Sequence, residues 1–369
     1  MTELINQRLK AARETRGLTQ AALSEQLGFK DRQTLAAIEA GQRKLAADEL
    51  LRAMQVLELD LDYFTDPYRL VGEGQFSWRT AKEAGAKLLD DFEARAGCWV
   101  ALYRSLEELK AAEANPLQQR LTALTDRSDF MDAQVAAESL VRRWGLGEIP
   151  ALGLEAKVRD ALDALVLYVD APKGISGAAC HLPELNAILI NRNEPEGRRH
   201  YDLAHETFHL LTWEQMPPDR REGEIPRGGK GHRVEQLADN FASALLMPER
   251  SLKPRWDARK GQGMHTWLNA TATEFLVTAV ALKWRLVQLG WLGKDELAAI
   301  KDNKLTSNGQ PPGERPKPRL FSAEFAERLR LAVDSGNLSV RKAASLLDTT
   351  IEDLAELFRS YELPVPFDL

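Results

Sequence analysis

Two histidines and a glutamate near the middle of the chain have the types and spacing of a hydrolytic metal site. They occur in the order His205-Glu206-Thr-Phe-His209 within a strongly helical stretch. Residues four apart on a helix lie about 40° apart around its axis and one turn along, so both imidazoles can bind one ion. Glu206 projects beside them, where its carboxylate can take a proton from water activated by the metal. Zinc suits such a donor set once a third ligand is present and a fourth position stays open.

A second helical stretch offers that third ligand. Glu235 and Asp239 are four residues apart and share one face, in a segment that ends at Pro248. One carboxylate can bind the metal while the other accepts a hydrogen bond from a ligand histidine and sets its tautomer. His232 is the rival third ligand, beside the glycine-rich residues 228–231. The alternative for the whole arrangement is a helix with two surface histidines facing a solvated acidic helix.

These motifs together carry a family resemblance. The segments His205-Glu-Thr-Phe-His209 and Glu235-x-x-Ala-Asp-x-Phe-Ala-x-x-Leu-Leu-Met-Pro248 resemble the ImmA/IrrE metallopeptidase family, which is gluzincin-like, over roughly residues 130–300. The resemblance implies His205, His209 and Glu235 as Zn²⁺ ligands, Glu206 as general base and Asp239 as a support for the ligands. It also implies that the substrates are repressors, cut near their DNA-binding domains to release a stress, phage or mobile-element programme.

One position departs from the family pattern. Phe208 stands before the second histidine, where the family usually has a small residue. Its ring either packs in the core or narrows the cleft and lowers activity. Cys180 offers a further alternative, because a thiolate could cap the open zinc position, although a small buried hydrophobe is the ordinary role of such a cysteine.

The N-terminal residues predict a DNA-reading module. Thr19 is a good helix cap, Gly28 a good helix stop, and a second helix begins near Asp31. This order resembles the XRE (Cro/C1-type) helix-turn-helix family over about 60 residues. We expect base-edge contacts from the exposed start of the second helix and phosphate contacts from its flanks. The base-edge candidates are Arg32, Gln33, Thr34 and Ala37, and the phosphate candidates are Gln20, Arg43 and Lys44.

Charge gives this module only weak support. Residues 1–66 contain nine Lys/Arg and eleven Asp/Glu, a net charge of −2, whereas DNA binders gain most of their affinity at phosphates. A domain kept for packing or protein contact is the alternative, and a homodimer would double the DNA contacts. The whole chain has a net charge of −6, which argues against non-specific coating of nucleic acid.

Composition and pattern then predict a mostly α protein with a small β-sheet (α+β). The expected domains are a five-helix-type helix-turn-helix domain (1–66), a helical connector (67–130), a zincin-like metallopeptidase domain (131–300), a linker (301–318) and a C-terminal helical domain (319–369). Strands are expected at 164–169 and 187–190, with Gly174 and Gly177 in the turn between them, and helices at 80–113, 116–144, 197–213, 233–247 and 270–289. Three short helices after Ser322 are expected to pack on the peptidase domain or on a second subunit.

Two functions remain open at this point. The first is a cytoplasmic zinc endopeptidase, coupled to an operator-binding domain, that cleaves a repressor or its own chain near residues 71–75. Its strand at 187–190 would be an edge strand that pairs with the extended substrate. The second is a DNA-binding transcription regulator whose peptidase-like domain is an inactive sensor or structural module. The sequence shows no apolar run of membrane-spanning length, no signal peptide and no CxxC pair, so a reducing, cytoplasmic location is expected.

Overall fold

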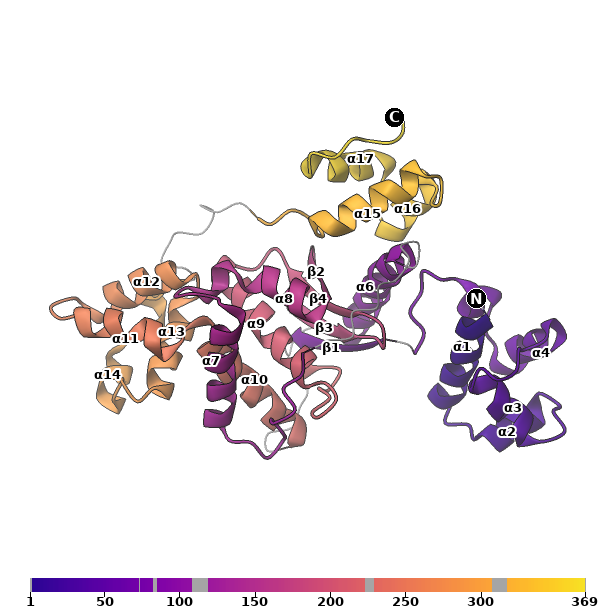
Figure 1. The fold of residues 1–369 in the computed structure, drawn as a ribbon, viewed down its shortest axis with the longest axis horizontal. Helices are drawn as coiled ribbons and strands as arrows, with labels where there is room; N and C mark the ends of the chain where they lie inside the picture. The colour runs from indigo at the N-terminus through magenta and orange to yellow at the C-terminus, as the bar shows by residue number, and fades with distance from the viewer. Residues whose placement is uncertain are drawn as a thin grey trace. The chain divides into compact units, whose positions relative to one another are not determined.

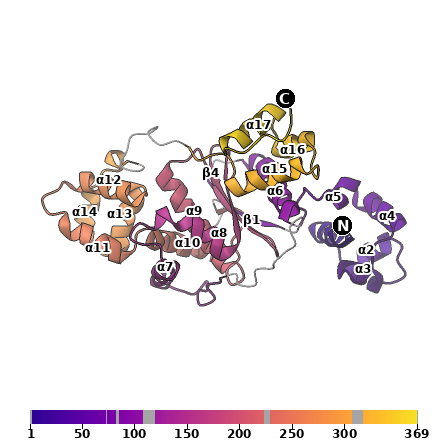
Figure 2. The ribbon, with the colours of Figure 1, turned by 45° about the horizontal axis from the view of Figure 1, so that its top comes forward.

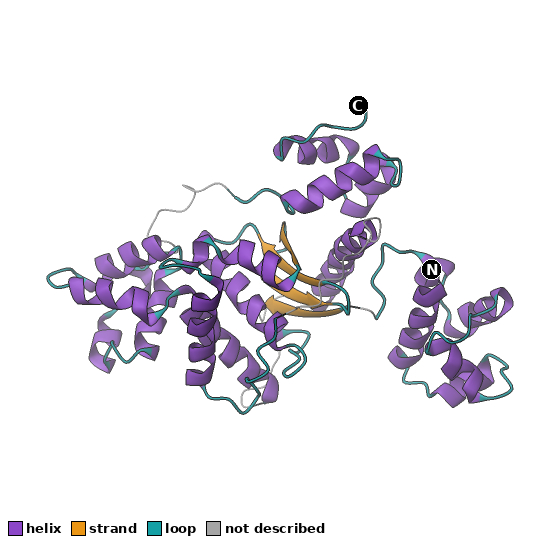
Figure 3. Ribbon diagram, viewed as in Figure 1, coloured by secondary structure: helices purple, strands orange, loops and turns teal. Residues whose placement is uncertain are grey.

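The structure is a computed structural model that describes residues 2–72, 74–81, 85–107, 119–222, 229–306 and 317–368. Its described residues are mostly helical, with one four-stranded sheet (Figure 3), which confirms the predicted fold class. The chain divides into two compact units. One comprises Met1–Gln75, Asp90–Glu113 and Ala323–Leu369, and the other comprises Phe76–Leu89 and Ala114–Ser322 (Figure 1).

Five helices at the start of the first unit form a small bundle. They are α1 (Thr2–Thr15), α2 (Gln20–Gln26), α3 (Arg32–Glu39), α4 (Ala47–Leu57) and α5 (Leu61–Thr65). Leu9, Leu35 and Phe64 are among the fully buried side chains at their centre. The predicted cap is confirmed, because Thr19 accepts a hydrogen bond from the N–H of Ala22, and α3 begins near Asp31 as predicted, with Asp31 accepting from the N–H of Thr34. Gly28 follows α2 with a φ of 73°, a conformation that favours glycine.

The rest of the first unit consists of a long helix and the C-terminal helices. α6 (Ala86–Glu107) contacts α15 (Ala323–Asp334), where the rings of Tyr103 and Phe325 stack with centroids 6.2 Å apart. The Arg328 guanidinium lies 4.4 Å from the centre of the Tyr103 ring. α16 (Val340–Leu347) and α17 (Ile351–Ser360) complete the group, and Ser339 and Thr350 cap them. The C-terminal helices thus pack on the connector helix.

The sheet of the second unit has the order β1-β3-β4-β2, with β1 (Gln75–Thr80), β2 (Ala164–Val169), β3 (Ile175–His181) and β4 (Asn186–Asn191). β4 pairs antiparallel with β3 and parallel with β2. The predicted strands 164–169 and 187–190 are therefore confirmed. The expectation that 187–190 forms an edge strand is wrong, because β4 has a partner on both sides.

Both edges of this sheet are covered. Beyond β2, Tyr168 pairs with Phe321. Beyond β1, Trp78 pairs with Arg221, and the Trp78 N–H donates to the carbonyl of Arg220 at 2.9 Å. β1 was not predicted, since its segment was assigned to a helical connector. The alternation of Phe76 and Trp78 with polar residues was a signal for it.

Gly177 lies inside β3, not in the turn predicted between the strands. A Cβ atom built there would lie 2.8 Å from the carbonyl oxygen of Leu189 on β4. We expect Gly177→Ala to destabilise the second unit by about 1–3 kcal/mol, because backbone atoms of a central strand pair must move apart. Thermal unfolding of this variant should show a lower midpoint, with Gly263→Ala, whose Cβ would meet only the Thr266 hydroxyl at 3.9 Å, as the control. Equal midpoints for the two variants would contradict the prediction.

Helices cover the sheet and build the site. α9 (Glu196–Thr212) packs on β3 and β4, α8 (Leu154–Leu162) packs on β2, and α10 (Lys230–Leu246) packs between α9 and α7 (Phe130–Trp144). Four further helices form one group in Figures 1 and 2, namely α11 (Glu249–Ala258), α12 (Met264–Phe275), α13 (Ala279–Gln288) and α14 (Lys294–Ala299). The predictions at 197–213 and 233–247 are confirmed.

Two helix predictions need correction. The helix expected over 116–144 begins only at Phe130, because residues 119–129 form turns and Asp129 caps α7. The single helix expected over 270–289 is two helices, broken where Leu276 adopts a φ of 56° and Thr278 caps α13. In both cases the apolar periodicity runs on without a break, but a capping residue starts a new helix within it.

Several sequence features fall outside the described residues. These are the break expected at 115–116, most of the linker at 307–316, Glu73 within the candidate cut site and Gly228 beside His232. None of the described helices combines the length and apolar character that crossing a membrane requires.

Candidate functional site

The predicted ligand residues converge in the second unit. α9 places the Nε2 atoms of His205 and His209 3.0 Å apart, and α10 places Glu235 Oε2 at 3.1 Å and 3.4 Å from them respectively. Both imidazoles are fully or almost fully buried. Glu222, which follows the chain segment beside β1, adds Oε1 at 3.2 Å from His205 Nε2. One ligand atom from each of the four residues lies within 4.8 Å of all the others.

This geometry fits a metal ion. Tetrahedral zinc with bonds of about 2.0–2.1 Å separates its ligand atoms by roughly 3.3 Å, and the two histidines and Glu235 show separations of 3.0–3.4 Å. Two adjacent imidazole nitrogens face one carboxylate oxygen. A cation between these three atoms would be coordinated by all of them. Glu235 Oε1 is also buried without a hydrogen-bond partner. The donor set of nitrogen and carboxylate oxygen is one that zinc uses.

A second layer of polar groups orients the first histidine. Asp239 Oδ1 lies 3.1 Å from His205 Nδ1 and therefore leaves Nε2 to face the other ligands. The same oxygen accepts a hydrogen bond from Arg79 of β1 at 3.2 Å, and the Tyr201 hydroxyl donates to the Asp239 carbonyl at 3.0 Å. Burial opposes ionisation of Asp239, but the hydrogen bond with His205 and the charge of Arg79 hold its pKa below the usual range.

Glu206 lies where it could act as a general base, and its carboxylate does not hold another described group in place. Its side chain is fully buried, and neither carboxylate oxygen has a hydrogen-bond partner in the part of the chain that the structure describes. Burial and the nearby charge of Glu222 raise the pKa of Glu206 well above its ordinary value. A carboxylate with no competing hydrogen bond is free to accept a proton from water beside the cluster, which is what a general base requires.

The structure places the remaining sequence candidates outside the cluster. Phe208 is fully buried and packs against Phe241, with ring centroids 5.3 Å apart, so it is a core residue and does not narrow a cleft. His232, the rival third ligand, lies in the first turn of α10 and is not part of the described cluster. Cys180 is buried in β3 opposite Ala187 and is likewise not among the clustered groups.

Two residues of the site were missed by sequence reasoning. Glu222 lies between the two motif helices, and no spacing rule links it to either. Arg79 lies more than a hundred residues before the first histidine, on the strand that was not predicted. Only the pairing of β1 with the sheet and with Arg221 brings both side chains to the cluster. The alternation in β1 was the one available signal.

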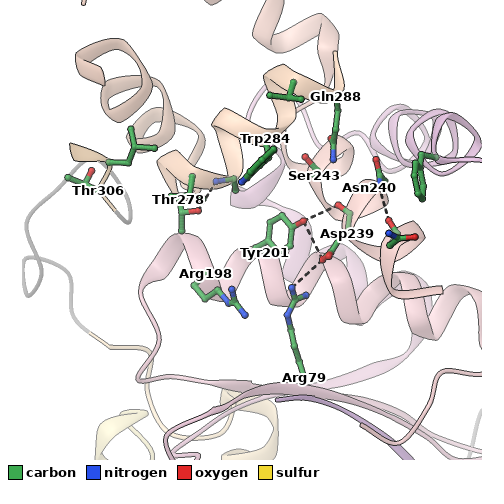
Figure 4. A pocket seen from close by; sticks show the side chains of 16 residues that line it. Arg79, Arg198, Tyr201, Asp239, Asn240, Ser243, Thr278, Trp284, Gln288 and Thr306 are labelled. Atoms are coloured by element: carbon green, nitrogen blue, oxygen red, sulfur yellow. Dashed lines mark hydrogen bonds and ion pairs between the residues drawn. The ribbon is translucent and has the colours of Figure 1, made fainter. Parts of the chain in front are cut away.

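A cavity of about 650 Å³ lies beside Asp239, the hydrogen-bond partner of His205. Arg79 and Tyr201 also line this cavity and form hydrogen bonds with Asp239, and Trp284 of α13 lies across from them (Figure 4). Three lining residues carry a buried polar atom without a hydrogen-bond partner: Ser243, Gln288 and Thr306. Such a recess beside a metal cluster is where a peptidase would hold a substrate side chain.

The predicted DNA-contacting residues lie together in the first unit. Arg32 and Gln33 are exposed at the start of α3, and Lys44 is exposed after it. Thr34 and Ala37 are half-buried on the same helix. Three of the candidates have partners within the domain, and one of these is Thr34, whose hydroxyl donates to Asp31 at 3.2 Å. Gln20 donates to Glu39 at 2.9 Å, and Arg43 forms an ion pair with Glu49 at 2.8 Å.

We expect Gln33→Ala to relax base preference at one position of the bound DNA. An amide can bond bidentately to adenine, and the loss of such a contact costs about 1–3 kcal/mol of discrimination. Selection of duplexes from a random library, followed by competition titration of the selected sequence, measures both preference and affinity. Arg52→Ala on α4, where Arg52 pairs with Asp48 at 3.0 Å, is the control. An unchanged preference in Gln33→Ala would contradict the prediction.

Comparison with protein families agrees with this geometry. A helix-turn-helix family model matches residues 9–64, and the peptidase M78 model, described as an IrrE N-terminal-like domain, matches residues 159–287. The chain therefore combines a helix-turn-helix domain with an IrrE-like domain. The IrrE-like match contains His205, His209, Glu222 and Glu235, whereas Arg79 lies outside it. No curated protein and no solved structure matches the chain. The two domains together support a DNA-binding transcription regulator.

Proposed function

We propose that this regulator is a cytoplasmic, zinc-dependent endopeptidase that cleaves a repressor or its own chain. The observation that carries the proposal is the convergence of His205 Nε2, His209 Nε2 and Glu235 Oε2 within 3.0–3.4 Å of one another. Glu206 lies buried beside them with both oxygens available. The helix-turn-helix domain would bring the peptidase to an operator and to proteins bound there.

In this proposal each group has a separate task. His205, His209 and Glu235 would hold zinc, which supplies a Lewis acid for the scissile carbonyl and for water. Glu206 would accept a proton from that water and pass it to the leaving amine. Asp239 would keep His205 in the tautomer that presents Nε2. The cavity bordered by Tyr201 would hold a substrate side chain.

Zinc content and intact mass, measured on the same samples over time, test the proposal. We expect about one zinc per chain in the wild type and none in the His205→Ala/His209→Ala double variant. Any clipping of the chain should require both zinc and the two histidines, and a clip near residues 71–75 would identify self-cleavage. Wild-type protein that rejects added zinc would overturn the enzyme proposal.

A second candidate function has its own structural support. The strand β1 occupies the sheet edge beside β3, and residues 220–221 cover β1 in turn. An extended substrate that paired with β1 would meet residues 220–221, and one that paired with β2 would meet Phe321. This favours a regulator whose IrrE-like domain binds metal as a sensor. Zinc binding without cleavage of any protein would support it.

A further inference from the structure

Glu222 occupies the place where a catalytic zinc site would stay open. Its Oε1 lies 3.2 Å from His205 Nε2, which matches the 3.0 Å and 3.1 Å separations of His209 and Glu235 from the same nitrogen. Its side chain is 12% exposed, the same fraction as that of Glu235. Glu222 Oε1 is buried and has no hydrogen-bond partner among the described residues. The atom therefore faces the cluster without another described partner.

Hydrogen bonds between β1 and residues 219–221 hold Glu222 beside the cluster. The N–H of Trp78 donates to the Arg220 carbonyl at 2.9 Å, and the Ser77 hydroxyl donates to the Asp219 carbonyl at 3.0 Å. Arg221 donates to the Thr80 hydroxyl at 3.2 Å. Residues 219–221 thus run along the outer side of β1 and deliver the next residue to the metal cluster.

Charge also favours ligation by Glu222. Two carboxylates would balance the charge of a divalent ion, as two histidines add none when neutral. Arg79 lies 3.9 Å from Glu222 Oε2 but closer to Asp202, at 3.3 Å, and to Asp239, at 3.2 Å, so its charge is shared among three carboxylates. Four protein ligands are typical of a closed site, whereas a catalytic site keeps one position for water.

We propose that Glu222 is a fourth protein ligand that closes the metal centre and keeps the peptidase latent until the 219–222 segment moves away from β1. The proposal rests on the metal binding proposed above. It explains how the chain can retain the zinc ligands and the general base although residues 219–221 cover the outer side of β1. Activation would then require loss of one carboxylate ligand, with the two histidines and Glu235 retained.

Cobalt substitution of the full-length protein tests this assignment without any activity assay. Co²⁺ replaces zinc and reports coordination through its visible absorption, and azide serves as an external ligand. We expect azide to leave the wild-type spectrum unchanged and to alter that of Glu222→Gln, where a position is open. Zinc affinity of Glu222→Gln should fall by at least about 10-fold, since loss of even an outer partner of a ligand costs 10–100-fold.

Two further variants separate ligation from charge and from folding. Glu206→Gln removes a neighbouring buried carboxylate and should keep both the zinc affinity and the azide-insensitive spectrum of the wild type. Glu222→Asp keeps the charge but shortens the reach, so it should respond to azide even if Glu222→Gln folds poorly. Azide sensitivity of the wild type, or wild-type behaviour of both Glu222 variants, would overturn the proposal. Wild type that binds neither zinc nor Co²⁺ would instead overturn the proposed zinc site.

Discussion

Glu206→Gln should lower the rate of peptide cleavage by about 10²–10⁴-fold, which is the usual contribution of a general base. The amide has the shape of the carboxyl group but cannot accept the proton from water. Neither Glu206 oxygen has a hydrogen-bond partner, so the substitution breaks no described hydrogen bond of this side chain. Zinc content should therefore stay at the wild-type level while cleavage is lost.

The measurement is the rate of cleavage of the protein's own chain or of a repressor, followed by intact mass. Glu214→Gln makes the same change at an exposed side chain just beyond α9, where Glu214 pairs with Arg120 at 3.6 Å. This control should cleave at the wild-type rate. Cleavage by Glu206→Gln at the wild-type rate would show that a different group activates the water.

The parts of the site that follow a helical spacing could be predicted from sequence. His205 and His209 are four residues apart on one helix, and Glu235 and Asp239 are four apart on another, so each pair shares a face by geometry alone. The structure brings the two pairs together, with Glu235 at 3.1 Å and Asp239 at 3.1 Å from opposite nitrogens of His205. The spacing does not show that the two pairs face each other, and it is the packing of α9 on α10 that brings them together.

The parts that depend on strand pairing could not be predicted in the same way. Sheet order is set by contacts between distant segments, so the interior position of β4 could not be distinguished from an edge by its apolar run. Gly177 appeared to be a turn residue because glycine is common in turns, whereas here it allows two strands to approach closely. Glu222 and Arg79 reach the site only through β1.

Arg79→Ala should destabilise the second unit by about 3–5 kcal/mol, because it leaves carboxylates without their counter-charge. Arg79 Nε lies 3.3 Å from Asp202 Oδ1, and the Asp202 side chain is fully buried. Arg79 also lies over the Tyr201 ring at 5.5 Å and bonds Asp239 at 3.2 Å. Its loss would therefore loosen β1 and α9 together and weaken the orientation of His205.

Hydrogen–deuterium exchange of peptides from α9 and α10 is the suitable measurement, because a chain with two compact units need not unfold in one step. Arg198→Ala is the matched control. Arg198 also pairs with Asp202, at 3.2 Å, but its side chain is 41% exposed, so its removal should cost less than about 1 kcal/mol. Equal protection in the two variants would show that Arg79 has no special part in holding the site.

The deficit of Arg79→Ala should also depend on pH. Burial raises the pKa of Asp202 even though Arg79 and Arg198 lower it, so removing Arg79 raises that pKa further. A carboxyl group whose pKa is higher in the folded state binds protons more readily there, so acid favours the folded form. The difference from the wild type should thus shrink as the pH is lowered and grow as it is raised. If the difference in stability between Arg79→Ala and the wild type does not change with pH, lost packing against Tyr201, and not the unpaired charge of Asp202, causes the destabilisation.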